Sequence, residues 1–219
     1  MAYQHAVQSL LYSCWDEELP DMHDKVFVGT EHYLKPFCFG RLEGEHRVER
    51  QNIVFQSPIL LELRSPDDRI VDIAANSLQA NPRRKMYRNT LTVSGLRTDM
   101  RLSFPANALI QTVSPITVHE TPEKGKTICY SPDDSEWYLR LSMNLASKLR
   151  ALHLDLPAEL SVTPAGFKPE KQVTRFKETY ITGYFGRFYL KADPRVIAVL
   201  YYCGLGNRNS QGFGLFNIL

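Results

Sequence analysis

Apolar residues recur with helical spacing in four places along the chain. The helices that they predict begin near Gln4, Ser65, Ser131 and Asp193. In the first of them, Val7, Leu11 and Cys14 fall on one face, which indicates an amphipathic helix over about residues 4–15. The second and third open on the same Ser-Pro-Asp-Asp tetrapeptide, in which the serine can cap and the acids favour a helix N-terminus.

Stretches rich in β-branched and aromatic residues lie between these helices and predict strands. They are residues 35–41, 52–63 and 86–104 in the first half, and 114–120, 172–181, 184–190 and 213–219 in the second. The second half thus runs strand, helix, strand, strand, helix, strand, which is the order of a ferredoxin-like fold. The first half has the same order without an opening strand. Either a preceding segment is absent from this chain, or the first sheet is completed in another way.

These orders predict an α+β protein of two tandem ferredoxin-like domains, the first of which lacks its opening strand. We expect the N-terminal domain at residues 1–111 and the C-terminal domain at residues 112–219. A chain of 219 residues with 43% hydrophobic content can bury a core in each domain without help from metals or disulfides.

Composition excludes several classes of protein. The four cysteines are scattered without a C-x-x-C pair, so neither a zinc site nor a disulfide framework is predicted. The paired acids at residues 67–68 and 133–134 are explained as helix-start residues, and we expect no metal and no cofactor. The longest apolar run, residues 196–203, is far shorter than the roughly 20 residues of a membrane span. We therefore expect a cytoplasmic protein without a membrane partner.

The net charge of +2 says little about partners, but the basic residues gather in two clusters. The first comprises Arg83, Arg84, Lys85, Arg88, Arg97 and Arg101. The second comprises Lys168, Lys171, Arg175, Lys177, Arg187 and Lys191, interleaved with Phe176, Tyr180 and Tyr184. Cations that neutralise phosphates, beside rings that stack on bases, are typical of RNA-binding surfaces. One such cluster alone would indicate only a solvated strand face.

A glycine-rich loop, residues 204–214, lies between the last predicted helix and the last predicted strand. Its four glycines allow positive φ angles and let a backbone approach a ligand closely. Successive amides in such a turn can hold phosphate oxygens, and Arg208 adds a fork of donors. The alternative is a flexible connector in which Gly204 merely ends the helix. No Gly-Lys-Ser/Thr follows, so the loop is not a Walker motif.

The segment from residue 167 to residue 219 combines a basic strand at 168–173, a glycine-containing turn at 181–188, Asp193-Pro194 at the start of a helix, and the closing loop. The loop follows the form G-x-G-x-x-N-S-x-G-F-G through Gly204, Gly206, Asn209, Ser210, Gly212, Phe213 and Gly214. This combination closely resembles the C-terminal region of the CRISPR-associated repeat-RNA endoribonucleases, a family of the RAMP superfamily. Weaker likeness reaches residues 114–116 and the N-terminal helix.

The resemblance implies two RAMP domains that bind a CRISPR repeat RNA and the guide RNA cut from it. RNA contacts are then expected from Gly204, Gly206, Asn207, Arg208, Asn209, Ser210, Gly212, Gly214, Lys168, Lys171, Arg175 and Lys177. It also implies protein partners, because members of the family often stay bound to the processed guide within a Cascade-type effector.

Metal-free cleavage of RNA needs a base for the ribose 2′-hydroxyl, an acid for the leaving 5′-oxygen, and positive charge at the phosphorus. The family's nucleases carry a tyrosine in the first helix, a histidine in the next loop and a lysine before the next strand. Tyr12, His23 and Lys35 stand at these places. The resemblance implies His23 as general acid or base, Tyr12 assisting at the 2′-hydroxyl, and Lys35 stabilising the transition state. The expected ends are a 2′,3′-cyclic phosphate and a 5′-hydroxyl.

Alternatives stay open at this level. His32 is the nearest substitute for His23, and His5 is a further one. Taken by itself, Tyr12 would indicate only a core residue, and Lys35 only a solvated charge at the end of a strand. A non-catalytic RAMP subunit would bind guide RNA without cutting it. A metabolic ferredoxin-like enzyme or regulator would need a small-molecule pocket, and the basic clusters argue against it.

Overall fold

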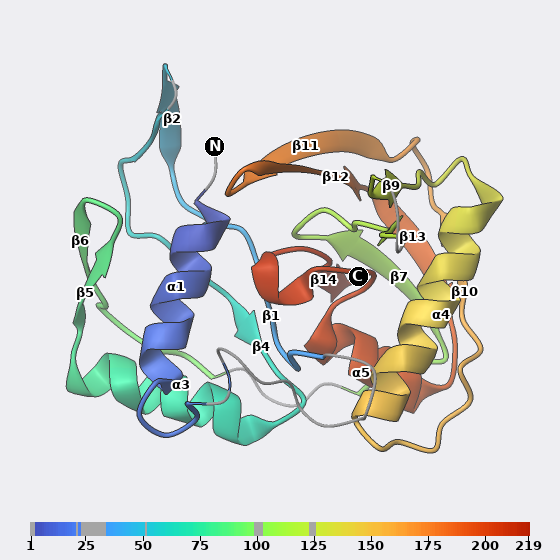
Figure 1. Ribbon diagram of the computed structural model, residues 1–219, viewed down its shortest axis with the longest axis horizontal. Coiled ribbons are helices and arrows are strands. Elements are labelled where there is room, and N and C mark those ends of the chain that lie inside the picture. The colour runs from blue at the N-terminus through green and yellow to red at the C-terminus, as the bar shows by residue number, and fades with distance from the viewer. Residues whose placement is uncertain (1–2, 21, 23–33, 51, 99–102, 123–125) are drawn as a thin grey trace.

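The structure is a computed structural model and describes residues 3–20, 22, 34–50, 52–98, 103–122 and 126–219. Figure 1 shows two halves side by side. We call residues 3–98 the N-terminal half and residues 103–219 the C-terminal half. Each half has its own hydrophobic core.

The C-terminal half contains one four-stranded antiparallel sheet. Its elements are β7 (Asn107–Thr112), β8 (His119–Glu120), β9 (Ile128–Cys129), α4 (Ser135–Ala151), β10 (Ser161–Pro164), β11 (Glu170–Phe176), β12 (Thr179–Phe185), β13 (Arg187–Lys191), α5 (Pro194–Cys203), a short 3-10 helix η1 (Asn209–Gln211) and β14 (Phe216–Ile218). The sheet has the order β10-β13-β7-β14. When the β11–β12 hairpin and the β8–β9 pair are set aside, β7, β10, β13 and β14 are the first to fourth strands along the chain. Their order in the sheet is then 2-3-1-4, which is the ferredoxin-like arrangement.

The opening strand of this sheet is β7, and not the strand predicted at residues 114–120. Within that stretch only β8 is a strand, and it pairs with β9. The remainder runs beneath the glycine-rich loop, where Gly214 N–H donates to Pro115 O and Asn207 N–H donates to Thr117 O, both at 2.9 Å. Ile116 forms one isolated bridge with Tyr184 of β12, and Ile116 and Val118 lie in the core of the C-terminal half. The apolar pattern of this stretch therefore reflects burial outside the four-stranded sheet, which a strand pattern cannot distinguish.

The elements described in the N-terminal half are helices and short strands. Its elements are α1 (Gln4–Trp15), β1 (Cys38–Phe39), β2 (His46–Glu49), β3 (Asn52–Phe55), β4 (Leu63–Arg64), α3 (Asp68–Ala80), β5 (Arg83–Met86) and β6 (Asn89–Thr92). β1 pairs with β4, while β2–β3 and β5–β6 are hairpins. Among the described residues α1 is the first element, as the pattern predicts.

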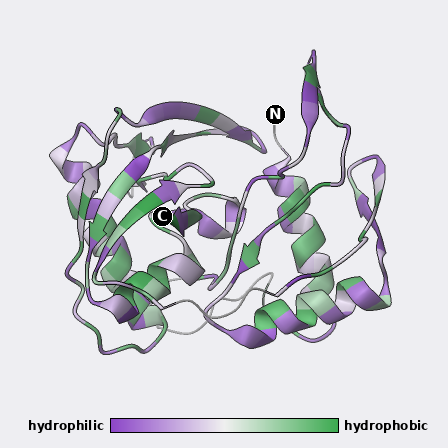
Figure 2. Cartoon of the chain, turned by 180° about the vertical axis from the view of Figure 1, so that it is seen from behind, coloured by the Kyte–Doolittle hydropathy of each residue, from purple (hydrophilic) through white to green (hydrophobic). Residues whose placement is uncertain are grey.

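The core of the N-terminal half lies between α1, α3 and the short β1–β4 ladder. Both helices carry hydrophobic and hydrophilic residues (Figure 2), and their apolar faces meet in a cluster that includes Val7, Leu11, Trp15, Phe37 and Ile70. The indole N–H of Trp15 donates to Ile70 O at 2.8 Å, so the buried ring is also anchored by a polar contact. No helix in the described ranges is long and apolar enough to cross a membrane.

The limit between the two domains follows from the hydrogen bonding of β7. This strand pairs with β13 on one side and β14 on the other, so it belongs to the C-terminal sheet. A boundary at residue 111 would cut through it. We therefore propose a boundary just before Asn107, a few residues earlier than the predicted one.

A buried arginine joins the two halves. Arg64, in β4, is 6% exposed, and its guanidinium donates to Phe216 O and to Asn217 Oδ1 in β14, each at 2.6 Å. It also donates to Glu62 Oε1 at 2.6 Å and lies 3.7 Å from the centre of the Tyr201 ring in α5. A planar cation with several fixed donors can satisfy these partners at once, whereas a lysine cannot. Arg64 is thus one of the contacts that hold the N-terminal half against the C-terminal half, beside those of Gln8 with Ser210 and of Cys38 with Tyr202.

We expect Arg64→Ala to lower the free energy of unfolding by about 3 kcal/mol, because Phe216 O and Glu62 would lose a charged partner inside the protein. Arg64→Lys should recover only part of this loss. The matched control is Arg69→Ala, which removes an exposed cation paired with Asp67 and should change stability far less, because water screens an exposed ion pair. Urea unfolding of the three variants measures the difference; equal effects of Arg64→Ala and Arg69→Ala would contradict the role given to Arg64.

Candidate active site

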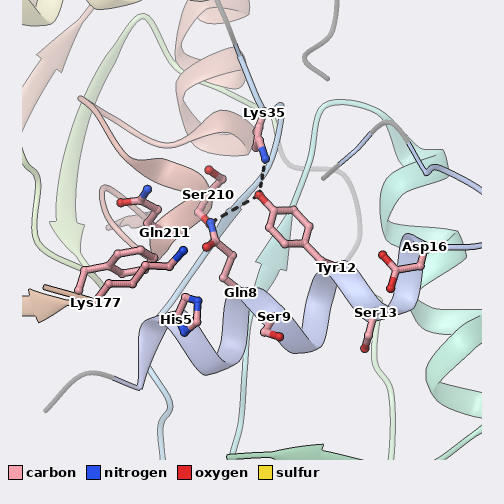
Figure 3. Close-up of a pocket in the computed structure, with 11 residues that line it drawn as sticks. His5, Gln8, Ser9, Tyr12, Ser13, Asp16, Lys35, Lys177, Ser210 and Gln211 are labelled. Atoms are coloured by element: carbon pink, nitrogen blue, oxygen red, sulfur yellow. Dashed lines mark hydrogen bonds between the residues drawn. The ribbon is translucent and has the colours of Figure 1, made fainter. Parts of the chain in front are cut away.

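A cavity of about 460 Å³ lies between α1 and the C-terminal half (Figure 3). Helix α1 supplies one wall, the tip of the β11–β12 hairpin a second, and the glycine-rich loop a third. The lining residues are His5, Gln8, Ser9, Tyr12, Ser13, Asp16, Lys35, Phe176, Lys177, Ser210 and Gln211. Both halves of the chain therefore build this cavity, and neither half contains it alone.

Tyr12 and Lys35 meet in the cavity. The Lys35 ammonium donates to the Tyr12 phenol oxygen at 2.7 Å, and Figure 3 shows the two side chains pointing toward each other. An ammonium has only donors, so the phenol oxygen is the acceptor in this bond. Burial raises the pKa of Tyr12 to about 12, which keeps the phenol protonated near neutral pH. Tyr12 can therefore act there as a hydrogen-bond donor, but not as a base.

Gln8 links α1 to the glycine-rich loop. Its side-chain amide donates to Ser210 O at 2.8 Å and lies 3.5 Å from the Tyr12 phenol oxygen (Figure 3). Gln8 and Tyr12 are four residues apart on α1, so they occupy the same face of the helix. This amide ties the loop to the helix that carries Tyr12.

One described histidine, His5, lines the cavity. Its ring packs edge-on against Phe176, with ring centres 5.7 Å apart. Partial burial and the nearby Lys177 cation lower the pKa of His5 below its ordinary value, so the ring is neutral at pH 7 and able to accept a proton. The two other histidines considered for catalysis, His23 and His32, lie outside the described residues.

The glycines of the loop are required by close packing inside the protein. Gly204, Gly206, Gly212 and Gly214 all have positive φ, as the sequence predicts. A Cβ at Gly206 would lie 2.5 Å from Thr117 O, and one at Gly214 would collide with Leu205 O. Both neighbours are backbone atoms that cannot move aside cheaply. The buried side chain of Asn209 fastens the loop further by donating to Leu205 O and Phe213 O.

This packing changes what the loop can offer to RNA. Six of its amides are used internally, because they donate to protein carbonyls: those of Gly204, Leu205, Asn207, Gln211, Gly212 and Gly214. The glycines themselves are buried, whereas Ser210 and Gln211 line the cavity. Arg208, two residues before Ser210, is half-buried. The structure shows that the four glycines and Asn209 pack inside the protein. Their contact with RNA stays a prediction.

A buried lysine that no sequence motif indicated holds the glycine-rich loop in place. The Lys148 ammonium, in α4, donates to Gly204 O at 2.5 Å and to Gly206 O at 2.9 Å. Its side chain is 2% exposed. A signal was present in the sequence, since Lys148 follows Leu141 and Leu145 on the apolar face of this helix, where a lysine has no place without a partner.

The β11–β12 hairpin carries the predicted basic strand. Its inner face packs Phe176 and Ile181 onto Phe213 of the loop. Its outer face presents Lys171 and Arg175, which lie opposite Tyr184 and Tyr180. Two of the four predicted cations are balanced by carboxylates: Lys168 pairs with Asp133 at 2.6 Å and Arg175 with Glu178 at 3.1 Å. Lys177, at the turn, lines the cavity and is the one cation that joins hairpin and candidate site.

No three His, Cys, Asp or Glu side chains of the described ranges come together in a way that could hold a metal ion. The first basic cluster, which begins at Arg83, falls on the β5–β6 hairpin and the chain after it, and its last member, Arg101, lies outside the described residues. None of the described members of this cluster lines the cavity.

The fold and sequence comparisons define the class of this protein. A solved structure from Pyrococcus furiosus, described as the product of a Cas6-related gene, superposes with a TM-score of 0.85 at 19% identity, covering 100% of this chain and 91% of that chain. A RAMP protein described as binding different RNA substrates gives a TM-score of 0.83 at 17% identity, covering 99% and 91%. At such identities the likeness shows the fold alone, and it confirms the predicted α+β fold of two tandem ferredoxin-like domains.

The family follows from the sequence. Residues 100–218, more than half of the chain, match the family model described as CRISPR associated protein Cas6, C-terminal. The chain belongs to the Cas6 family. It is also 31% identical over 113 residues to CRISPR-associated endoribonuclease Cas6 1 of Methanocaldococcus jannaschii. That match covers 49% of this chain and 43% of the relative, so the chain aligns with less than half of the relative's length.

We expect Lys148→Met to loosen the glycine-rich loop. The substitution keeps an apolar side chain but leaves two buried carbonyls without their donor, which should lower the free energy of unfolding by about 2 kcal/mol at neutral pH. Arg150→Met is the matched control, because it removes an exposed cation from the same helix.

The difference between wild type and Lys148→Met should also depend on pH. Burial lowers the pKa of Lys148 from its ordinary 10.5 to about 8. At pH values between these two, the unfolded chain still holds the proton that the folded protein has released. The free energy of unfolding of the wild type therefore increases with pH in this range, whereas that of the variant lacks this contribution. Urea titrations at roughly pH 7 and pH 10 measure this. A difference that stays constant would show that the ammonium is not buried in solution.

Proposed function

We propose that this Cas6-family chain is a metal-independent endoribonuclease that cuts CRISPR repeat transcripts into guide RNAs. The observation that carries the proposal is the Tyr12–Lys35 pair, held in a cavity to which both halves of the protein contribute. Two residues implied by a family pattern and 23 positions apart in sequence meet at 2.7 Å. The curated relative of this chain is named an endoribonuclease, which supports the same activity.

The reaction requires proton transfer and charge stabilisation. A base removes the proton of a ribose 2′-hydroxyl, the oxygen attacks the adjacent phosphorus, and the bond to the 5′-oxygen breaks as an acid supplies a proton. The products are a 2′,3′-cyclic phosphate and a 5′-hydroxyl. In this proposal His23 is the general acid or base, and Tyr12 assists at the 2′-hydroxyl as a hydrogen-bond donor. Lys35 stabilises the negative charge that builds up on the phosphate oxygens.

His5 is the alternative proton acceptor. It lies on the α1 face that carries Tyr12, and its neutral ring suits a base at pH 7. We assign the role of general acid or base to His23, and His5 and His32 are the alternatives to test beside it.

The RNA would reach the cavity along the β11–β12 hairpin and the glycine-rich loop. Lys171 and Lys177 supply positive charge along the hairpin, whereas Arg175 is paired with Glu178, and Ser210 and Gln211 supply polar groups at the cavity wall. We infer that the protein stays bound to the repeat stem-loop after the cut and joins other subunits of a Cascade-type effector.

A second candidate function is that of a non-catalytic RAMP subunit that binds guide RNA. It is favoured by the close structural likeness to the RAMP protein described only as binding different RNA substrates. Both candidates predict RNA binding, and only the first predicts cleavage.

We expect the protein to cut a labelled repeat RNA in the presence of EDTA and to leave cyclic phosphate and 5′-hydroxyl ends. Tyr12→Phe should slow single-turnover cleavage by about a hundredfold, and Lys35→Ala by at least as much, because each removes a group that acts on the reacting phosphate. His23→Ala should abolish cleavage while RNA binding persists. Ser13→Ala, in the same cavity but bonded to its own helix, is the matched control and should cut normally.

The histidine variants divide the outcomes. Loss of cleavage in His5→Ala or His32→Ala, with His23→Ala active, would move the acid–base role to that residue. A wild-type protein that binds the repeat tightly but never cuts it, with or without added Mg²⁺, would replace the nuclease by the guide-binding subunit. A protein that binds no RNA would refute both.

A further inference from the structure

Two glutamine side chains in the walls of the cavity each keep one polar atom that the proposed reaction does not use. Gln8 belongs to α1 and Gln211 to η1 in the glycine-rich loop, so they line the cavity from two different walls (Figure 3). In the part of the chain that the structure describes, neither Gln8 Oε1 nor Gln211 Nε2 forms a hydrogen bond. A polar atom in this position needs water or a ligand as its partner.

The orientation of both amide groups is fixed by their protein partners. Gln8 Nε2 donates to Ser210 O at 2.8 Å, and a backbone carbonyl only accepts, so the nitrogen of Gln8 has to face the loop. Gln211 Oε1 accepts from Arg208 Nη1 at 3.1 Å, and a guanidinium only donates, so the oxygen of Gln211 has to face Arg208. Gln8 is thereby left with an acceptor for a ligand, and Gln211 with a donor.

These two amides lie next to the Tyr12–Lys35 pair. Gln8 Nε2 is 3.5 Å from the Tyr12 phenol oxygen. In Figure 3, Gln8 and Ser210 lie between Tyr12 on one side and Gln211 on the other. A phosphate bound at the pair therefore leaves the base of an adjoining nucleotide within reach of both amides. The cavity volume of about 460 Å³ is in the range of sites that enclose a small ligand.

A ring that can support a base is present at the same end of the cavity. His5 lies three residues before Gln8 on α1, so the two side chains occupy the same face of the helix. The His5 ring is held edge-on against Phe176, with the ring centres 5.7 Å apart. Histidine is one of the side chains on which unstacked RNA bases stack. The site thus offers a base one ring, one acceptor and one donor.

We propose that Gln8 and Gln211 read the base of a nucleotide beside the cut, and that they favour adenine. Adenine carries its N6 amino group next to a ring nitrogen that accepts, on both of its edges, and protein amides pair with this combination. The amino group donates to Gln8 Oε1 while the ring nitrogen accepts from Gln211 Nε2. Guanine has a carbonyl oxygen in place of the amino group, and this oxygen would face Gln8 Oε1 without a hydrogen between them. Cytosine offers the favourable pair on one edge only.

The inference rests on the proposed function and deepens it, because it names the base that the candidate site selects. Cleavage itself requires groups that act on the phosphate, and neither amide has that role. The base preference is therefore a property that can fail while cleavage persists.

The test measures single-turnover cleavage in EDTA by saturating protein. The substrates are repeat RNAs that differ only in the base on the 5′ side or on the 3′ side of the cut. At one of these two positions we expect adenine to be cut about tenfold faster than guanine. Gln211→Met should bring the ratio of these two rates close to one. Gln79→Met is the matched control, because Gln79 is exposed on α3 and does not line the cavity, and it should keep the wild-type ratio.

Changes of single atoms in the RNA test the same contacts with the wild-type protein, and do not depend on how well a variant folds. Purine riboside lacks the amino group of adenosine and should be cut about tenfold more slowly at the selected position. Either 7-deazaadenosine or 1-deazaadenosine, each of which lacks one ring acceptor, should also be cut more slowly. That deaza substitution should cause no further loss in Gln211→Met, because the donor that it would deprive is already absent.

Equal rates for all four bases at both positions would overturn the inference and leave the nuclease proposal intact. An adenine preference that Gln211→Met and the deaza substitutions leave unchanged would overturn it as well. A protein that cuts none of these RNAs would refute the proposed function, and the inference with it.

Discussion

The candidate site depends on the buried contact between Arg64 and β14. This contact helps to set the position of the N-terminal half against the C-terminal half, and both halves line the cavity. A guanidinium suits the position because its donors point in fixed directions and reach Phe216 O, Asn217 and Glu62 together. A shift between the halves would separate α1 from the glycine-rich loop, and the Gln8 bond to Ser210 would be lost before the Tyr12–Lys35 pair itself is touched.

The glycine-rich loop is a structural part of this arrangement as much as a binding element. Lys148 holds it through the carbonyls of Gly204 and Gly206, and backbone atoms of residues 115 and 117 take two of its amides. Glycine is needed there because a side chain would collide with protein atoms. The rigid loop then presents Ser210 and Gln211 to the cavity, and a rigid wall orients a ligand better than a mobile connector would.

Particular elements show how far the sequence could go. The bounds of α1 and the start of α5 follow from apolar spacing and from the Asp-Pro pair, since both signals are local. The prediction of the opening strand at residues 114–120 was wrong because this stretch is buried in the core beside the glycine-rich loop and pairs only at Ile116 and in β8, and such burial leaves the same apolar pattern as a strand of the sheet. The family pattern indicated Tyr12 and Lys35, and the structure brings them together. The roles of Gln8 and Lys148 could not be predicted, because their partners are far away in sequence.

The central claim is that an RNA phosphate lies beside Tyr12 and Lys35, between the two halves. A crystal structure of the protein with a repeat RNA that carries a 2′-deoxy nucleotide at the cleavage point tests it most directly, because the missing hydroxyl blocks the cut. We expect the phosphate that follows this nucleotide to lie within hydrogen-bonding distance of the Tyr12 phenol and the Lys35 ammonium. The same phosphate bound elsewhere, with the cavity free of RNA, would contradict the account.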